Sequence, residues 1–128
     1  MSSPEKDPKE LLPLTAVTLN ILLALADAER HGYGIMLEVE HRTGGAMRLG
    51  PGTLYSTIKR LRDGGMIEDT GHRPDPELDD ERRRYYRLTD LGQQVLTAEI
   101  ERLNSVVDDA RRKGISPGHF PGSAPEGA

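Results

Sequence analysis

The pattern of apolar positions predicts a chain made mainly of helices. Residues Leu11 to Ala28 are nearly all Leu, Ala, Val and Ile, and the run is too long for a single strand, so we predict a helix there. This helix is apolar over more than half of its circumference. The domain core can cover one side of it, and a second subunit could cover the other. After a break at 31–33, a second helix is expected over Gly34 to Thr43.

A third helix is predicted between Gly50-Pro51, which opens it, and Gly64-Gly65, which stops it. Leu54, Ile58 and Leu61 have the i, i+4, i+7 spacing of one helix face, so we expect them to face the core. The residues expected to point away from the core are short polar or charged ones: Thr53, Ser56, Lys59, Arg60 and Asp63.

Two strands and a final helix follow. Met66 to Thr70 and Arg83 to Leu88 are the candidate strands, joined by a long turn rich in Gly and Pro. Thr89 suits the N-cap of the final helix, in which apolar residues are spaced 4, 3, 4, 3. These dimerisation candidates are Leu96, Ile100, Leu103, Val107 and Ala110. They are predicted to pair with a partner helix, although packing on the chain's own first helix stays an alternative.

The chain has 128 residues, enough for one domain. Residues 1–10 are expected to be a disordered arm, and residues 114–128, rich in Gly, Pro and Ser, a flexible tail. Residues 11–88 then form the domain body, and residues 89–113 the final helix. The predicted fold class is α+β, mainly helical: a winged helix-turn-helix with a two-stranded wing and a C-terminal dimerisation helix.

Composition excludes several classes of protein. The absence of cysteine excludes disulfides, thiolate catalysis and cysteine-based metal sites. No apolar run approaches the ~18 residues of a membrane span, and the first ten residues are polar and charged. We therefore expect no membrane partner, no secretory signal and a cytoplasmic location.

Catalytic and metal-binding motifs are also missing. The four histidines, His31, His41, His72 and His119, never have the i, i+4 spacing of a helical zinc site, and we expect each to be a surface or turn residue. The two short Gly-rich segments lack the rest of a phosphate-binding loop. No nucleophile motif is present. We predict no enzyme activity, no metal and no cofactor.

Charge is distributed unevenly. With 17 basic and 21 acidic residues the formal net charge is −4, whereas DNA-binding domains usually carry a basic excess. Because the Debye length is about 8 Å at physiological salt, local clusters matter more than the sum. Between Gly44 and Arg62 lie four basic residues and no acid, and Arg82, Arg83, Arg84 and Arg87 form a second cluster.

These basic clusters favour DNA binding by the third helix and the strands. Short Thr53 and Ser56 allow close approach to base edges, while Lys59 and Arg60 can reach bases or phosphates. The arginines at 82–84 alternate sides along a strand, so at least one should meet a phosphate or the minor groove. Tyr85 and Tyr86 alternate as well, so one of them is expected to pack inward.

Several segments resemble the PadR family of bacterial transcription regulators. The matching residues are His31-Gly32-Tyr33-Gly34, Gly52-Thr53-Leu54-Tyr55 with Arg60-Leu61 and Gly65, and Arg84-Tyr85-Tyr86 with Leu88-Thr89 and Gly92. The single helix after the wing is similar to the short subfamily. The resemblance implies a homodimer on operator DNA that most often represses and that releases DNA on sensing a small molecule.

The resemblance also implies particular DNA contacts. Tyr33 would touch a phosphate at the start of the second helix, and Arg83 and Arg84 would belong to the wing. The expected contacts on or beside the third helix are Thr53, Tyr55, Ser56, Lys59 and Arg60. Ser56 stands where many family members have Pro. Effector-binding residues cannot be carried over. The competing hypothesis is a winged-helix module that binds a protein rather than DNA, which the net acidity slightly favours.

Overall fold

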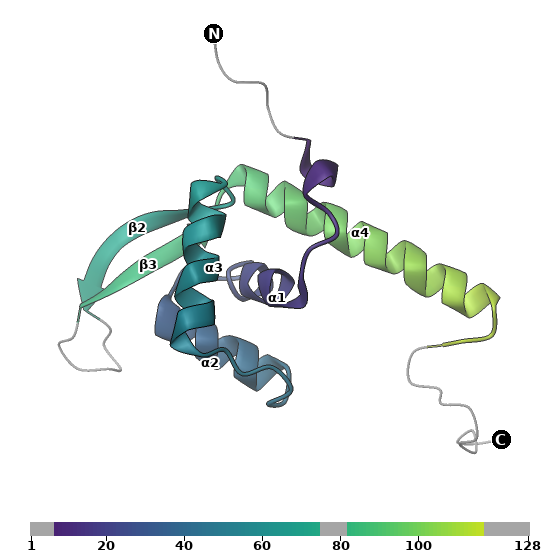
Figure 1. Cartoon of the computed structure of the whole chain (residues 1–128), viewed down its shortest axis with the longest axis horizontal. Coiled ribbons are helices and arrows are strands. Elements are labelled where there is room, and N and C mark those ends of the chain that lie inside the picture. The colour runs from purple at the N-terminus through teal and green to yellow at the C-terminus, as the bar shows by residue number, and fades with distance from the viewer. Residues whose placement is uncertain (1–6, 75–81, 117–128) are drawn as a thin grey trace, which may run out of the picture.

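The computed structural model describes residues 7–74 and 82–116. Its helices and strands follow in the order η1 (Pro8–Leu11, a 3-10 helix), α1 (Ala16–Ala24), β1 (Arg30–His31), α2 (Gly32–Arg42), α3 (Pro51–Asp63), β2 (Ile67–Pro74), β3 (Arg82–Leu88) and α4 (Asp90–Arg112). Helices α1 to α3 gather beside the N-terminal half of α4, and β2 and β3 extend from the body as a wing (Figure 1). The C-terminal half of α4 projects away on the other side (Figure 1). The α+β winged fold predicted from the sequence is confirmed.

The first predicted helix is wrong in its extent. Instead of one helix from 11 to 28, the short η1 ends at Leu11 and α1 begins only at Ala16. Pro13 explains the gap, because a proline lacks an N–H and disfavours helical backbone in the residue before it. Thr15 then starts α1, since its hydroxyl accepts the N–H of Thr18 at 3.1 Å. Residues 8–10 of the expected disordered arm belong to η1, while residues 1–6 lie outside the described part.

Helix α3 begins and ends as predicted. Pro51 occupies its first turn, and Gly65, at φ +78°, continues the chain beyond its end. Leu54, Ile58 and Leu61 are all buried. They join a core formed by α1, α2, β2, β3 and α4, whose largest fully buried apolar side chains also include Ile21, Leu22, Ile35, Ile67 and Val95.

Among the residues that the structure describes, the sheet has three strands in the order β1-β3-β2, so the sequence missed one of them. The missed strand β1 has only two residues and pairs antiparallel with β3, Arg30 opposite Tyr86 and His31 opposite Tyr85. Strand β2 runs past the predicted end at Thr70, because a bulge absorbs that residue between Asp69 and Gly71. Gly71, at φ +110°, has the backbone freedom that the bulge requires.

Helix α4 is held tightly against the end of β2. The Thr89 hydroxyl caps it by accepting the N–H of Gly92 at 3.1 Å, as the sequence predicted, and donates to the Gly65 carbonyl. A Cβ on Gly92 would come within 1.9 Å of the Met66 carbonyl oxygen. Only glycine therefore allows this close packing. Across the described ranges 7–74 and 82–116, no helix combines the length and apolar character needed to cross a bilayer.

Candidate nucleic-acid interface

Helix α3 exposes its polar side together with the ring of Tyr55. All four of the predicted contacts that point outward, Thr53, Ser56, Lys59 and Arg60, lie on this exposed face. The Lys59 ammonium makes an ion pair with Asp63 at 2.7 Å, one turn along the helix. The Arg60 guanidinium donates to the Thr57 hydroxyl at 3.3 Å, and the Ser56 hydroxyl donates to the Thr53 carbonyl at 3.2 Å.

Tyr55 joins α3 to the start of α2. Its side chain is half exposed, and its ring lies directly over Gly32. A Cβ on Gly32 would come within 2.6 Å of the Tyr55 hydroxyl oxygen, so glycine is needed for this approach. Tyr55 therefore has a packing role that its predicted role as a DNA contact did not include.

The start of α2 also brings two predicted contacts together. The Arg83 guanidinium of β3 lies 5.9 Å from the centre of the Tyr33 ring. The Tyr33 ring in turn stacks near His31, with 6.5 Å between ring centroids. A cation over an aromatic face is weakly attractive, so the start of β3, at the far end of the wing, and the α2 N-terminus meet at Tyr33.

His31 is a functional position that the sequence interpretation missed. It was expected at the surface or in a turn, but it is buried. Its Nδ1 accepts the N–H of Gly34 at 2.9 Å and so caps α2, and its ring meets Tyr85 edge-on at 5.2 Å. The sequence could have indicated the capping role of His31, because a polar residue directly before a helix is a cap candidate. As predicted for the tyrosine pair, Tyr86 packs inward.

Carboxylates accompany the arginines of the wing. Arg84, the other predicted wing contact, makes an ion pair with Asp69. This hydrogen bond holds the pKa of the Asp69 carboxyl below its ordinary value. Two further wing pairs follow the same pattern, Arg73 with Glu29 and Arg87 with Glu68. The hydroxyl of Thr70, and secondarily Arg73, lower the pKa of the Glu29 carboxyl. The basic face is thus partly neutralised within the chain, which the local charge count did not reveal.

The predicted dimerisation residues fall into two groups. Leu96 is buried in the core of its own protomer, together with Val95 on the same helix, so it is not exposed to a partner. Ile100 is exposed, and Leu103, Val107 and Ala110 are half-buried on the part of α4 that leaves the body. Val106, which the spacing did not select, is 52% exposed on the same projecting segment. The apolar surface left uncovered is therefore the predicted set without Leu96.

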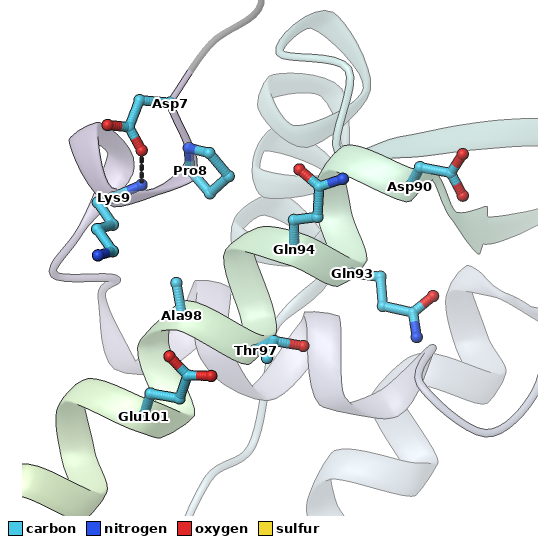
Figure 2. A pocket seen from close by; sticks show the side chains of 9 residues that line it. All are labelled: Asp7, Pro8, Lys9, Asp90, Gln93, Gln94, Thr97, Ala98 and Glu101. Atoms are coloured by element: carbon cyan, nitrogen blue, oxygen red, sulfur yellow. Dashed lines mark hydrogen bonds between the residues drawn. The ribbon is translucent and has the colours of Figure 1, made fainter.

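Two neighbouring grooves run along α4 and share Gln93, Thr97 and Glu101. One is lined by side chains of η1 and α4, which Figure 2 shows on either side of the opening. Its lining residues are Asp7, Pro8, Lys9, Asp90, Gln93, Gln94, Thr97, Ala98 and Glu101. The other groove includes Leu23 of α1 and Ile100 of α4. Among the residues that the structure describes, no three metal-ligating side chains come together.

The helix-and-wing arrangement defines the class of fold: a winged helix-turn-helix. Residues 21–98, more than half of the chain, match the model of the family described as Transcriptional regulator PadR-like, and the chain belongs to that family. The family groups transcriptional regulators, in agreement with the prediction that the chain is not an enzyme.

Individual relatives agree with this assignment. The chain is 34% identical over 91 residues to the Transcriptional regulator Rv3488 of Mycobacterium tuberculosis, covering 71% of this chain and 78% of that protein. It is similar to RosR of H. salinarum, with 28% identity, a TM-score of 0.61, and coverage of 81% of this chain and 89% of that one. The structure of Bacillus subtilis PadR in complex with operator DNA shares the fold, with a TM-score of 0.57 at 21% identity and coverage of 80% and 64% of the two chains.

Proposed function

We propose that this protein is a sequence-specific DNA-binding transcriptional regulator that acts as a homodimer on a roughly palindromic operator. The observation that carries the proposal is the division of α3. Its aliphatic residues Leu54, Ile58 and Leu61 are all used in the protomer's own core. Its exposed side offers hydroxyls, cations and the half-exposed Tyr55 ring. A helix of this kind suits the major groove, with the wing on the phosphates.

The homodimer is supported by α4. Its projecting half carries apolar side chains that the protomer leaves uncovered. Two copies related by a twofold axis would bury them and present two α3 helices, about 34 Å apart, to successive major grooves. Repression and release by a small-molecule effector complete the proposal, because they are what the family resemblance implies. Cytoplasmic action follows from operator DNA as the partner.

Fluorescence anisotropy with the DNA upstream of the protein's own gene tests the proposal. If a dimer makes about eight phosphate contacts, log K should fall with log salt at a slope near −7. Several plausible operators should be compared with a duplex of random sequence. If the protein binds none of them more tightly than the random duplex, sequence-specific recognition is contradicted.

A pair of lysine variants separates α3 from general charge. Lys59→Ala should weaken operator binding by about 1–3 kcal/mol if Lys59 contacts a base, and less if it contacts only a phosphate. Lys113→Ala removes the same charge from the exposed end of α4 and should leave operator binding nearly unchanged. Equal losses in both variants would point to non-specific attraction instead.

The second candidate is a winged-helix module that binds a protein. The net charge of −4 and the carboxylates paired with the wing arginines favour it. Recovery of a partner in a pull-down that survives high salt, together with no shift of any duplex, would support this alternative.

A further inference from the structure

Arg84 and Asp69 form a well-defined ion pair on the wing. The two carboxylate oxygens of Asp69 have separate partners: one pairs with the Arg84 guanidinium, and the other accepts the N–H of Gly71 at 2.8 Å. The Asp69 side chain is 21% exposed and that of Arg84 45%. Asp69 is thus anchored by the β-bulge, while the arginine it holds remains accessible from solvent.

The pair lies on the sheet face that meets α3. Asp69 is opposite Tyr86 in the β2–β3 register, and Arg84 is two residues from Tyr86 on β3, so all three share one face. Tyr86 is buried in the core, and burial together with the nearby Asp69 raises its pKa. Arg84 therefore continues the same face toward the far end of the wing, where the proposed function puts DNA.

An arginine cannot give the same N–H groups fully to a carboxylate and to a phosphate. Both acceptors prefer the same charge-assisted, often bidentate geometry. Asp69 occupies the Nη1 group of Arg84, so a phosphate must either displace the carboxylate there or bind the remaining N–H groups of a cation that Asp69 already neutralises. The carboxylate also stays close to the phosphates, so the pair as a whole brings no net charge to the DNA.

We propose that Asp69 competes with DNA phosphate for Arg84 and thereby lowers the affinity of the wing for any duplex. This inference rests on the proposed function and names a regulating residue within the same site. It accounts for a DNA-binding face in a chain of net charge −4: internal carboxylates limit non-specific attraction, so more of the binding free energy has to come from contacts of α3.

Asp69 differs from two other acids that pair with basic side chains, Asp63 and Glu68, in how its carboxylate is held and where it points. Asp63 pairs with Lys59, but both side chains are mostly exposed, so they separate at little cost. Glu68 pairs with Arg87, but it neighbours Asp69 on β2 and so points to the opposite sheet face. Glu68 is therefore the matched control: it carries the same charge on the same strand, but its partner Arg87 is not among the predicted DNA contacts.

The test compares Asp69→Asn with Glu68→Gln by anisotropy on a duplex of mixed sequence, between ~50 and ~200 mM salt. Asparagine keeps an oxygen for the Gly71 N–H, and circular dichroism and thermal unfolding check that the fold is retained. Asp69→Asn should raise affinity about two- to fivefold per wing, the strength of an exposed ion pair. It should also steepen the salt slope by about 0.9 per wing, because one more net charge meets the DNA. Glu68→Gln should change both quantities less.

A double-mutant cycle with Arg84→Ala shows whether the effect passes through Arg84. In the Arg84→Ala background, Asp69→Asn should raise the affinity for the duplex no more than Glu68→Gln does. A gain that persists without Arg84, or an equal gain from both acid variants, would overturn the competition. If neither the wild type nor Asp69→Asn binds any duplex, the proposed function fails as well. If the wild type binds DNA and Asp69→Asn binds it with the same affinity, the competition is contradicted while the proposed function stands.

Discussion

Helices α3 and α4 are both amphipathic, yet they leave opposite kinds of surface uncovered. In α3, the protomer covers the aliphatic face, including Leu54 and Ile58, and hydroxyls, charges and the half-exposed Tyr55 ring remain outside. In α4, the protomer covers the first half, around Val95 and Glu99, and the apolar face continues beyond the body to Val106.

The difference shows that the kind of partner suited to a helix depends on which of its side chains, polar or apolar, the protomer leaves exposed. A basic polar face without apolar area suits a polyanion, where phosphate contacts dominate the affinity. An apolar stripe exposed to water suits a second protein surface, because its burial is favourable by about 25 cal/mol per Å². Single substitutions can test the role of each surface separately.

The largest effect is expected where a charge enters the uncovered apolar stripe of α4. Leu103→Asp should weaken dimerisation by about 3–5 kcal/mol, because a buried carboxylate without a partner is costly. Sedimentation equilibrium measures the change. Ser105→Asp places the same charge on the opposite side of α4 and should dimerise like the wild type. Identical behaviour of the two variants would remove the stripe as an interface.

The buried face of α3 should respond through folding. Ile58→Ala leaves a cavity in the core and should lower the free energy of unfolding by about 3 kcal/mol. Val106→Ala removes apolar atoms from an exposed site and should change it by no more than about 0.5 kcal/mol. Urea unfolding of both variants in the Leu103→Asp background excludes effects of dimerisation. A comparable loss in Val106→Ala would mean that the projecting segment packs within the protomer.

The joint between the wing and α4 should be sensitive to one methyl group. Gly92→Ala should cost roughly 2 kcal/mol of stability, since the added Cβ meets the Met66 carbonyl oxygen. Gly52→Ala, in α3, adds the same group where no atom lies within 4 Å of it. It should be neutral or stabilising by up to about 1 kcal/mol. Thermal unfolding distinguishes them, and equal melting temperatures would contradict the close packing.

The smallest effect concerns the covered half of α4 and depends on pH. The Glu99 side chain is 1% exposed; it pairs with Arg102 and accepts the N–H of Leu14 at 2.8 Å, and these contacts, Arg102 foremost, lower the pKa of its carboxyl despite burial. A lowered pKa in the folded state stabilises the fold above the ordinary glutamate pKa, and this contribution is lost as the pH falls through the folded value.

Glu99→Gln should therefore cost about 1 kcal/mol at pH ~7, and its difference from the wild type should shrink as the pH falls below ~4.5. Denaturant unfolding at several pH values measures both quantities. Glu101→Gln, an exposed site on the same helix, is the control and should show little change. A cost that is the same at every pH would show that the charge of Glu99 contributes nothing.

Local signals predicted the elements whose boundaries are made by neighbouring residues. Pro51 and Gly64-Gly65 bound α3, and Thr89 begins α4, as expected. The break at Pro13 was also a local signal, but the long apolar run around it was given more weight. Strand β1 had no such signal, since two residues become a strand only through pairing with β3.

For the candidate interface, the sequence predicted which residues are exposed but not which of them contact one another. The exposed side of α3 followed from helical spacing, and it was confirmed. The meeting of Arg83 with Tyr33, and of Asp69 with Arg84, requires the register of β2 and β3 and the bulge at Thr70. The residue types of β2 and β3 alone do not determine that register.

The sequence by itself determined which faces of the helices are apolar, where α3 begins and ends, and where cations cluster. Each of these depends on side chains within a few positions of one another. Only the tertiary structure decided that Leu96 is covered while Val106 is not, and that the arginines of the wing already hold carboxylates. Burial and ion pairing depend on distances between segments that are far apart in the chain, and folding alone establishes those distances.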